Sequence, residues 1–197
     1  MQRRKFMLVA VSLGTTGLAV SGCTTTGTAA TTPDTVAESA QRRSKIDASA
    51  SSTLDHLYNN VKGSRTLVAK ANGVLIFPSV IAAGLGIGGE YGEGALRAHG
   101  TTLDYYSIAS VSIGLQAGAQ SKAIIFLFMT QDALNKFRSS QGWAVGVDAS
   151  VAVLKVGANG ELDTSSATGP VLAFVLTNAG LMANLSLEGT KVTRLKS

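Results

Sequence analysis

Three separate segments of this chain alternate apolar residues with small or polar ones, and this alternation constrains the fold more than any other feature. The alternation runs through residues 109–117, 144–156 and 181–187. Because successive side chains of a strand point to opposite faces, each segment predicts a half-buried strand. Residues 123–129 and 171–176 are apolar at every position, which is typical of central strands covered on both faces.

Glycine is frequent in this chain, at 22 of 197 residues or about 11%, against about 7% in an average protein. Six of the glycines lie between Gly84 and Gly94. A glycine within a strand permits a sharp bend or the close approach of another backbone. The segment therefore predicts a glycine-rich strand that bends.

Helical periodicity is strongest near the N-terminus. We expect a first helix that begins at Asp34 or Thr35 and ends at Gly63. Its apolar residues recur at spacings of three and four: Ile46, Ala50, Leu54, Leu57, Tyr58 and Val61. This stripe is more often packed on a core than inserted into a membrane.

Two shorter helices complete the prediction. One covers 64–71 with Ser64 as its cap and precedes an apolar run that stops at Pro78; the other covers 130–139 with Thr130 as its cap. The predicted class is α+β, with a curved antiparallel sheet or partly closed barrel of about six to eight strands, N-terminal helices and one internal helix.

The first 22 residues have the three parts of an export signal: a cationic start, an apolar run and two small residues. The run is shorter than the roughly 20 apolar residues that a membrane-spanning helix needs. Val20, Ser21, Gly22 and Cys23 resemble the bacterial lipobox, in which the cysteine is acylated, with palmitate among the expected chains, and becomes the first mature residue. Two or more acyl chains anchor a protein stably to a membrane.

The expected organisation is a lipoprotein signal at 1–22, a flexible tether at 23–35 and one domain at 36–197. Thr24 stands where an aspartate would signal retention in the inner membrane of enteric bacteria. We therefore expect a lipid anchor facing the periplasm, in the outer membrane rather than the inner one. Arg3 and Arg4 leave the general and twin-arginine export routes open.

The sequence offers little for catalysis, metal or cofactor binding. With one cysteine, the chain has neither an internal disulfide nor a zinc-type ligand spacing. Residues 84–89 fit G-x-G-x-x-G, but the glycines that follow disfavour the helix that a dinucleotide site requires. His56 and His99 are expected at the surface, and Glu90 and Glu93 as solvated carboxylates rather than an acid pair. We expect no enzyme activity, no cofactor and no metal.

Charge argues against nucleic-acid binding. The formal charge of the whole chain is +5, but three of the basic residues lie in the leader. The mature chain keeps 14 basic and 12 acidic residues, a net charge of +2.

From Ala71 to Gly94 the chain combines Asn-Gly-Val-Leu-Ile-Phe-Pro with a glycine run that ends in Gly-Gly-Glu-Tyr-Gly-Glu-Gly, and in this it resembles the SYLF domain family. The similarity continues through 112–118, 124–128 and 132–137, and includes the ending 178–189. It covers roughly residues 36–196. The family implies a lipid-binding module that contacts acidic phospholipids through a basic segment near the domain's N-terminus.

The candidate phosphate contacts that this resemblance implies are Arg42, Arg43, Lys45, Lys62, Arg65 and Lys70. Many members carry a lysine shortly after the proline region, where this chain has Ala82 and Ala83. Three functions remain open. The first is binding of a phospholipid membrane by the domain itself, and the second is a structural or protein-interaction role in the envelope, with lipid contact only through Cys23. The third is a carrier with an apolar cavity inside the sheet.

Overall fold

The computed structural model describes residues 36–155, 161–162, 168–177, 180–181 and 187–196, without the side chains of 84–87, 112–119 and 180. Residues 34–197 form a compact unit by their own contacts. Its helices are α1 (Val36–Asn60), α2 (Ser64–Lys70) and α3 (Gln131–Ser139). Its strands are β1 (Gly73–Ala98), β2 (Thr101–Phe128), β3 (Trp143–Ala144), β4 (Val151–Val153), β5 (Val171–Thr177), β6 (Gly180–Leu181) and β7 (Lys191–Arg194).

The described strands form one curved sheet in the order β3, β7, β2, β5, β4, with β1 paired to β2 and β6 to β5. The predicted α+β class with a curved sheet is therefore confirmed. One pair differs from the expectation, because β4 runs parallel to β5 while the other strand pairs are antiparallel.

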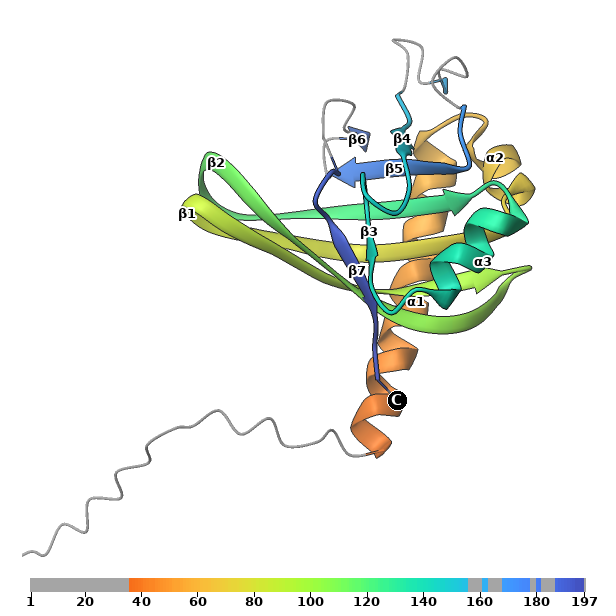
Figure 1. Ribbon diagram of the computed structural model, residues 1–197, viewed down its shortest axis with the longest axis horizontal. Coiled ribbons are helices and arrows are strands. Elements are labelled where there is room, and N and C mark those ends of the chain that lie inside the picture. The colour runs from red at the N-terminus through yellow and green to blue at the C-terminus, as the bar shows by residue number, and fades with distance from the viewer. Residues whose placement is uncertain (1–35, 156–160, 163–167, 178–179, 182–186, 197) are drawn as a thin grey trace, which may run out of the picture. The chain divides into compact units, whose positions relative to one another are not determined.

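A long hairpin of β1 and β2 is the main element of the sheet. Its ladder runs from the Gly73–Phe128 pair to the Ala98–Thr101 pair, with shifts of register at three points. The turn contains His99 and Gly100 with φ of 50° and 80°, the left-handed conformation that tight hairpins require. Figure 1 shows the paired strands leaving the body, bending and returning across it.

Glycines make this doubling back possible. A side-chain Cβ at Gly92 would lie 2.6 Å from the carbonyl oxygen of Ser79, and one at Gly94 would clash with the carbonyl oxygen of Ile76. The second half of β1 thus lies against the first half of the same strand. The glycine-rich bend expected from the sequence is confirmed, and the ladder shifts register between Gly84 and Gly86.

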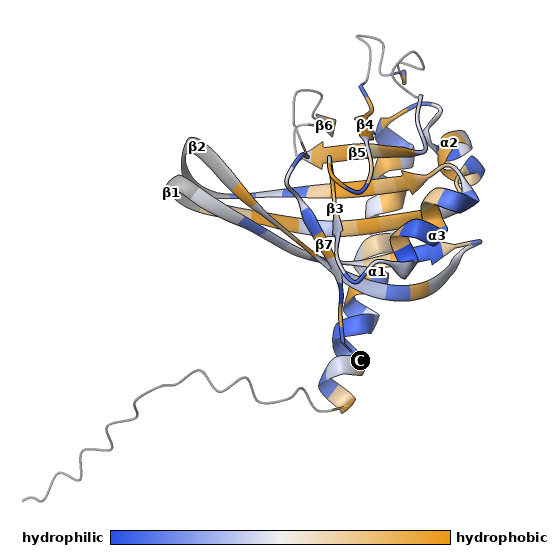
Figure 2. Ribbon diagram, viewed as in Figure 1, coloured by the Kyte–Doolittle hydropathy of each residue, from blue (hydrophilic) through white to orange (hydrophobic). Residues whose placement is uncertain are grey.

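Hydrophobic side chains pack on both faces of the sheet. Figure 2 shows that hydrophobic residues make up most of β5 and of the neighbouring parts of β1 and β2. On one face α1 and α2 cover apolar residues of β1, β2 and β5, among them Ile76, Ile125 and Phe174. On the other face α3 and the second half of the hairpin enclose an aromatic cluster: Phe77, Tyr106, Phe126, Phe128, Phe137 and Trp143. Of the two segments predicted to be central, 171–176 is buried throughout and 123–129 is buried at 124–128, with Ala123 and Met129 half-buried at its ends.

Several local predictions need correction. Residues 144–156 are not one strand, because Gly146 adopts a φ of 87° and turns the chain between β3 and β4, leaving Val147 83% exposed. Pro78 does not end its strand, because it lies where the ladder with β2 skips residues. Ser64 is not a cap: its hydroxyl donates to the carbonyl of Val61 at 2.6 Å.

The helix predictions hold in most respects. The stripe of α1 faces the core, with Ile46, Ala50, Leu57 and Val61 buried. In α3 the hydroxyl oxygen of Thr130 accepts from the amide of Ala133, which is the expected cap. The predicted strand at 181–187 falls largely on residues 182–186, outside the described part of the chain. No helix within that part is long and apolar enough to cross a membrane.

Candidate functional site

Three of the six candidate phosphate contacts, Arg42, Arg43 and Lys45, lie on the N-terminal half of α1. Arg42 forms an ion pair with Glu93 of β1, in which its Nε donates to Oε2 at 2.7 Å and its Nη2 contacts Oε1. The hydroxyl of Tyr91 donates to the same Oε1 at 2.8 Å. The hydrogen bonds from Arg42, ahead of those from Tyr91, hold the pKa of Glu93 below its ordinary value despite partial burial.

Two of the arginines lie over aromatic rings. The guanidinium carbon of Arg43 is 5.5 Å from the ring centre of Tyr105, and that of Arg65 is 4.2 Å from the ring centre of Tyr58. Both distances suit a cation–π contact. Arg65 is exposed and Arg43 half-buried, so both can still meet an anion at the surface.

The lysines are more open. Lys45, Lys62 and Lys70 are exposed. Lys62 and Lys70 line the same groove at the junction of α1 and α2, with a volume of about 440 Å³. Leu67 and Leu162 give the groove apolar walls, and Gly63, Thr66 and Glu161 complete the lining. The structure thus brings two of the six candidates together around a partly apolar hollow, and places the other four elsewhere on α1 and α2.

A polar cluster that sequence reasoning did not identify fastens α1 to the hairpin. Asp47 accepts hydrogen bonds from Tyr105 at 2.6 Å and from Thr102 at 2.7 Å, and Arg97 lies 3.5 Å from the same carboxylate. Burial raises the pKa of Asp47, but these hydrogen bonds and the Arg97 charge outweigh it and lower the pKa. Burial and the bond to Asp47 raise the pKa of Tyr105 to about 12.

The two carboxylates considered as an acid pair have separate partners. Glu90 accepts from Lys122 at 2.8 Å and from Ser110 at 3.1 Å, whereas Glu93 binds Arg42. Three positions separate the two glutamates along one strand, so they point to opposite faces. Each carboxylate is in an ion pair and at most 20% exposed, which corrects the expectation that both are simply solvated.

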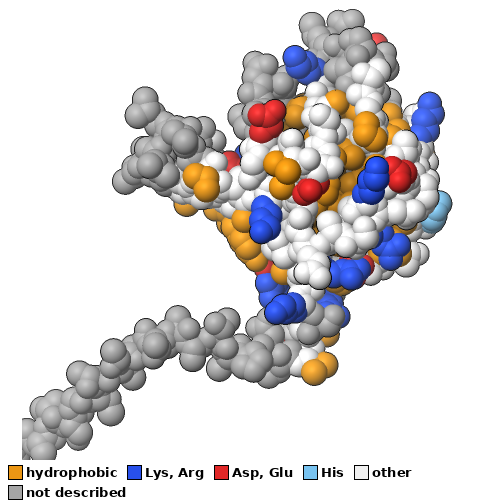
Figure 3. Space-filling view, viewed as in Figure 1, with side chains coloured by type: hydrophobic (Ala, Val, Ile, Leu, Met, Phe, Trp, Pro, Cys, Tyr) orange, Lys and Arg blue, Asp and Glu red, His pale blue; other side chains and the backbone are white. Residues whose placement is uncertain are grey.

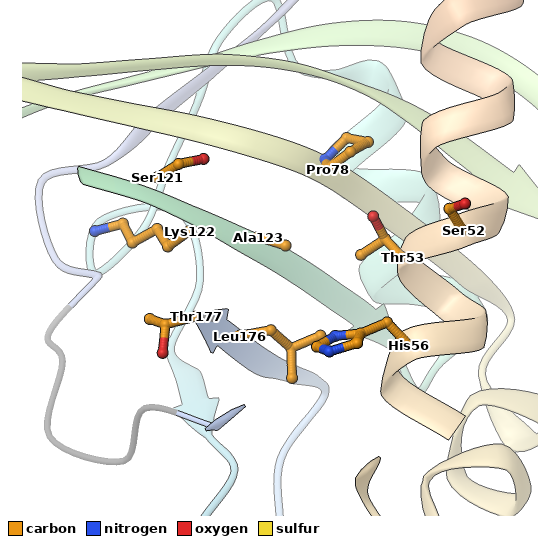
Figure 4. A pocket seen from close by; sticks show the side chains of 9 residues that line it. All are labelled: Ser52, Thr53, His56, Pro78, Ser121, Lys122, Ala123, Leu176 and Thr177. Carbon is orange, nitrogen blue, oxygen red and sulfur yellow. The ribbon is translucent and has the colours of Figure 1, made fainter. Parts of the chain in front are cut away.

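A second hollow of about 200 Å³ lies between α1 and the sheet (Figure 4). His56 points from α1 toward Leu176 of β5, and Lys122 extends away from the helix. The remaining lining residues are Ser52, Thr53, Pro78, Ser121, Ala123 and Thr177. His56 and His99 are both exposed, as expected, and no basic candidate from the sequence lies here.

The remaining kinds of site considered from the sequence are a dinucleotide-binding loop, a metal site and a lipidation site. Residues 84–89 lie within β1, so no helix begins there to hold a dinucleotide phosphate. The described residues contain no group of three or more His, Cys, Asp or Glu side chains placed to bind a metal. Val20, Ser21, Gly22 and Cys23 lie outside the described residues, so the lipobox and the lipidation site remain predictions.

Comparison with known families supports the resemblance. Residues 109–197 match the family model Ysc84, described as a Las17-binding protein actin regulator. The match places residues 109–197 in a SYLF (Ysc84) domain. A search of curated proteins finds no match to the chain. SYLF domains are lipid-binding or protein-interaction domains, and the match spans the second half of β2, α3 and the strands that follow.

The basic candidates lie before this match in the sequence. Helices α1 and α2 and strand β1 lie before residue 109, but β1 pairs with β2 along its whole length and α1 packs on both strands. The lower boundary of the domain at residue 36 remains a prediction. Basic residues could be found from the sequence because their charge is local. Nothing in the sequence indicated that Glu93 and Tyr91 meet Arg42, or that Asp47 meets the hairpin.

Proposed function

We propose that this chain is a non-catalytic lipoprotein whose SYLF domain binds acidic phospholipid head groups. An acylated Cys23 holds it at a bacterial membrane, facing the periplasm, with the outer membrane favoured over the inner one. The observation that supports head-group binding is the groove at the α1–α2 junction, where Lys62 and Lys70 flank the apolar side chains of Leu67 and Leu162. A phospholipid combines an anionic phosphate with apolar chains. The two lysines suit the phosphate and the two leucines suit the chains, while Glu161 is the one acidic residue among the described residues of the lining.

The packing of α1 limits the mode of contact. Its apolar stripe is buried against the sheet, so the helix cannot insert that stripe into a bilayer without giving up the core. Figure 3 shows lysine and arginine side chains distributed over the face in view rather than gathered in one patch. Binding by such residues depends on charge and weakens with salt. Tethering through Cys23 raises the local concentration of lipid, so weak affinity suffices.

Vesicle cosedimentation of residues 34–197, which lack Cys23, tests the proposal. We expect more protein to pellet with phosphatidylcholine vesicles that contain phosphatidylglycerol than with phosphatidylcholine alone, and less as salt increases. Lys62→Ala with Lys70→Ala should reduce this pelleting. The charge-matched control is Lys136→Ala with Arg138→Ala on α3, which should not. Equal pelleting with both vesicle types would exclude the electrostatic mechanism.

The family description favours a second function, because it names binding to a protein. In this alternative, the domain is a structural or interaction module of the envelope, and Cys23 alone contacts lipid. Its signature is a specific crosslinked partner on the intact lipoprotein, together with an isolated domain that pellets with neither vesicle type. The carrier hypothesis has less support, because aromatic side chains fill the space between α3 and the sheet.

A further inference from the structure

One candidate phosphate contact already holds an anion from its own chain. Arg42 and Glu93 meet through two contacts, one of them Nε to Oε2 at 2.7 Å, and Tyr91 adds a third hydrogen bond at 2.8 Å. The side chain of Arg42 is 43% exposed and that of Glu93 20% exposed. The pair therefore lies at the surface, where an external anion can reach the guanidinium.

The geometry of this pair is one that a phosphate can also adopt. The planar guanidinium donates two parallel hydrogen bonds to a carboxylate or to two oxygens of a phosphate. Lys45 is exposed and follows Arg42 by three residues, so the two cations are neighbours on the surface of α1. An anion in the position of the Glu93 carboxylate would meet a guanidinium and a phenol, with an ammonium close by.

We propose that Arg42 and Tyr91, with Lys45 at the rim, form a phosphate-binding subsite that Glu93 occupies in the free protein. The ligand class is a phosphate ester of a lipid head group or free phosphate. This inference rests on the proposed lipid binding. It adds that the carboxylate of Glu93 competes with the lipid phosphate for Arg42 and Tyr91. A membrane must displace Glu93, so the subsite engages only where anionic phosphate is dense.

The energetics allow such an exchange. An ion pair at the protein surface contributes little net stability, because water solvates the partners when the pair opens. A phosphate that replaces the carboxylate restores the lost hydrogen bonds. Glu93 thus reduces affinity by a modest factor without closing the subsite.

Quantitative vesicle binding by residues 34–197 tests the competition. Glu93→Gln should bind vesicles of phosphatidylcholine and phosphatidylglycerol about three- to fivefold more tightly than the unmodified domain, which corresponds to removal of an exposed ion pair. The matched control is Asp104→Asn, which removes the same charge and releases Arg194 from a comparable exposed pair. The control should change binding by less than the Glu93 variant does.

A double-mutant cycle separates competition from net charge. In an Arg42→Gln background the gain from Glu93→Gln should disappear, because the subsite no longer exists. A gain that persists without Arg42, or that Asp104→Asn reproduces in full, would overturn the inference. No gain in Glu93→Gln, while the unmodified domain still prefers acidic vesicles, would overturn it and leave the proposed function standing. If the unmodified domain shows no preference for acidic vesicles, the proposed function itself is refuted.

Inorganic phosphate distinguishes the two sources of the ligand. Inorganic phosphate should displace the Glu93→Gln variant from acidic vesicles, and it should do so less when Arg42 is also replaced. That result supports a site for the phosphate group itself. If phosphate has the same effect in both backgrounds, it acts by general screening, and the subsite is refuted as a phosphate site.

Discussion

At the residue scale, Gly94 shows how a missing side chain shapes the sheet. Its Cα faces the carbonyl of Ile76 so closely that a Cβ has no space. Gly89, in the same strand, has open surroundings, and its nearest neighbour would be the Ser110 carbonyl oxygen at 3.9 Å from a Cβ. Both glycines belong to the same glycine-rich run, but only Gly94 lies where a side chain has no space.

Gly94→Ala should therefore destabilise the domain by about 1–3 kcal/mol, because the two halves of β1 must move apart. Gly89→Ala should change stability by about 0.5 kcal/mol or less. Urea unfolding of both variants measures the difference. Equal midpoints would mean that the close approach of the two halves contributes nothing to the fold.

Asp47 and Tyr105 predict a defined pH dependence of stability. The pKa of Asp47 is lowered in the folded state, so its contribution is complete above its unfolded pKa, near 4, and is lost as pH falls through the folded value. The pKa of Tyr105 is raised to about 12, so its contribution is complete below about pH 10 and is lost between about 10 and 12.

Asp47→Asn should flatten the acid limb of a plot of unfolding free energy against pH, and Tyr105→Phe the alkaline limb. Thr102→Val serves as a control that removes one hydrogen bond to Asp47 without removing a titrating group. If neither limb changes, the cluster does not couple α1 to the hairpin in the way that its geometry indicates.

At the scale of elements, α1 combines two kinds of attachment. Its later turns are held by apolar packing, with Ala50 and Leu57 fully buried, and its earlier turns by the polar contacts of Arg42, Arg43 and Asp47. The helix is therefore part of the domain core. Its basic residues are surface groups on a fixed support rather than one side of a membrane-inserting helix.

Leu57→Ala should cost about 2–5 kcal/mol in unfolding free energy, because it leaves a cavity between α1 and the sheet. Val36→Ala, on the same helix but 87% exposed, should cost less than about 0.5 kcal/mol. Thermal or urea unfolding followed by circular dichroism compares them. A small effect at Leu57 would contradict the assignment of α1 to the core.

At the scale of the whole domain, two hydrophobic clusters share the central strands β2 and β5. Neighbouring residues of these strands contribute to opposite clusters, as Phe126 and Leu127 do. Loss of packing on one face of these strands therefore also weakens the support for the hydrophobic cluster on the opposite face. Both layers should unfold together in residues 34–197.

Trp143 provides the measurement, because it is the single tryptophan of the chain and lies buried in the aromatic cluster. Its fluorescence reports on one layer, whereas far-UV circular dichroism is dominated by α1 on the other. The two urea transitions should coincide within error. Separate midpoints would show that the clusters are independent folding units.

Local pattern was sufficient to predict the central strands, the three helices and the cap at Thr130. Those features depend on neighbours within a few residues along the chain. Burial of one face produces an apolar repeat of two residues in a strand and of about 3.6 residues in a helix. The interrupted strand at 144–156 shows the limit, because Val147 continues the apolar alternation and yet is exposed at the turn after Gly146.

Composition and periodicity predict a glycine-rich, weakly charged sheet that follows a helical segment with six candidate basic residues. What each of these basic residues contacts depends on the tertiary structure. Arg42 and Glu93 are 51 residues apart, and Asp47 and Tyr105 are 58 apart. They meet because the bent hairpin returns beneath α1, and that curvature depends on packing between distant strands, which local periodicity does not encode.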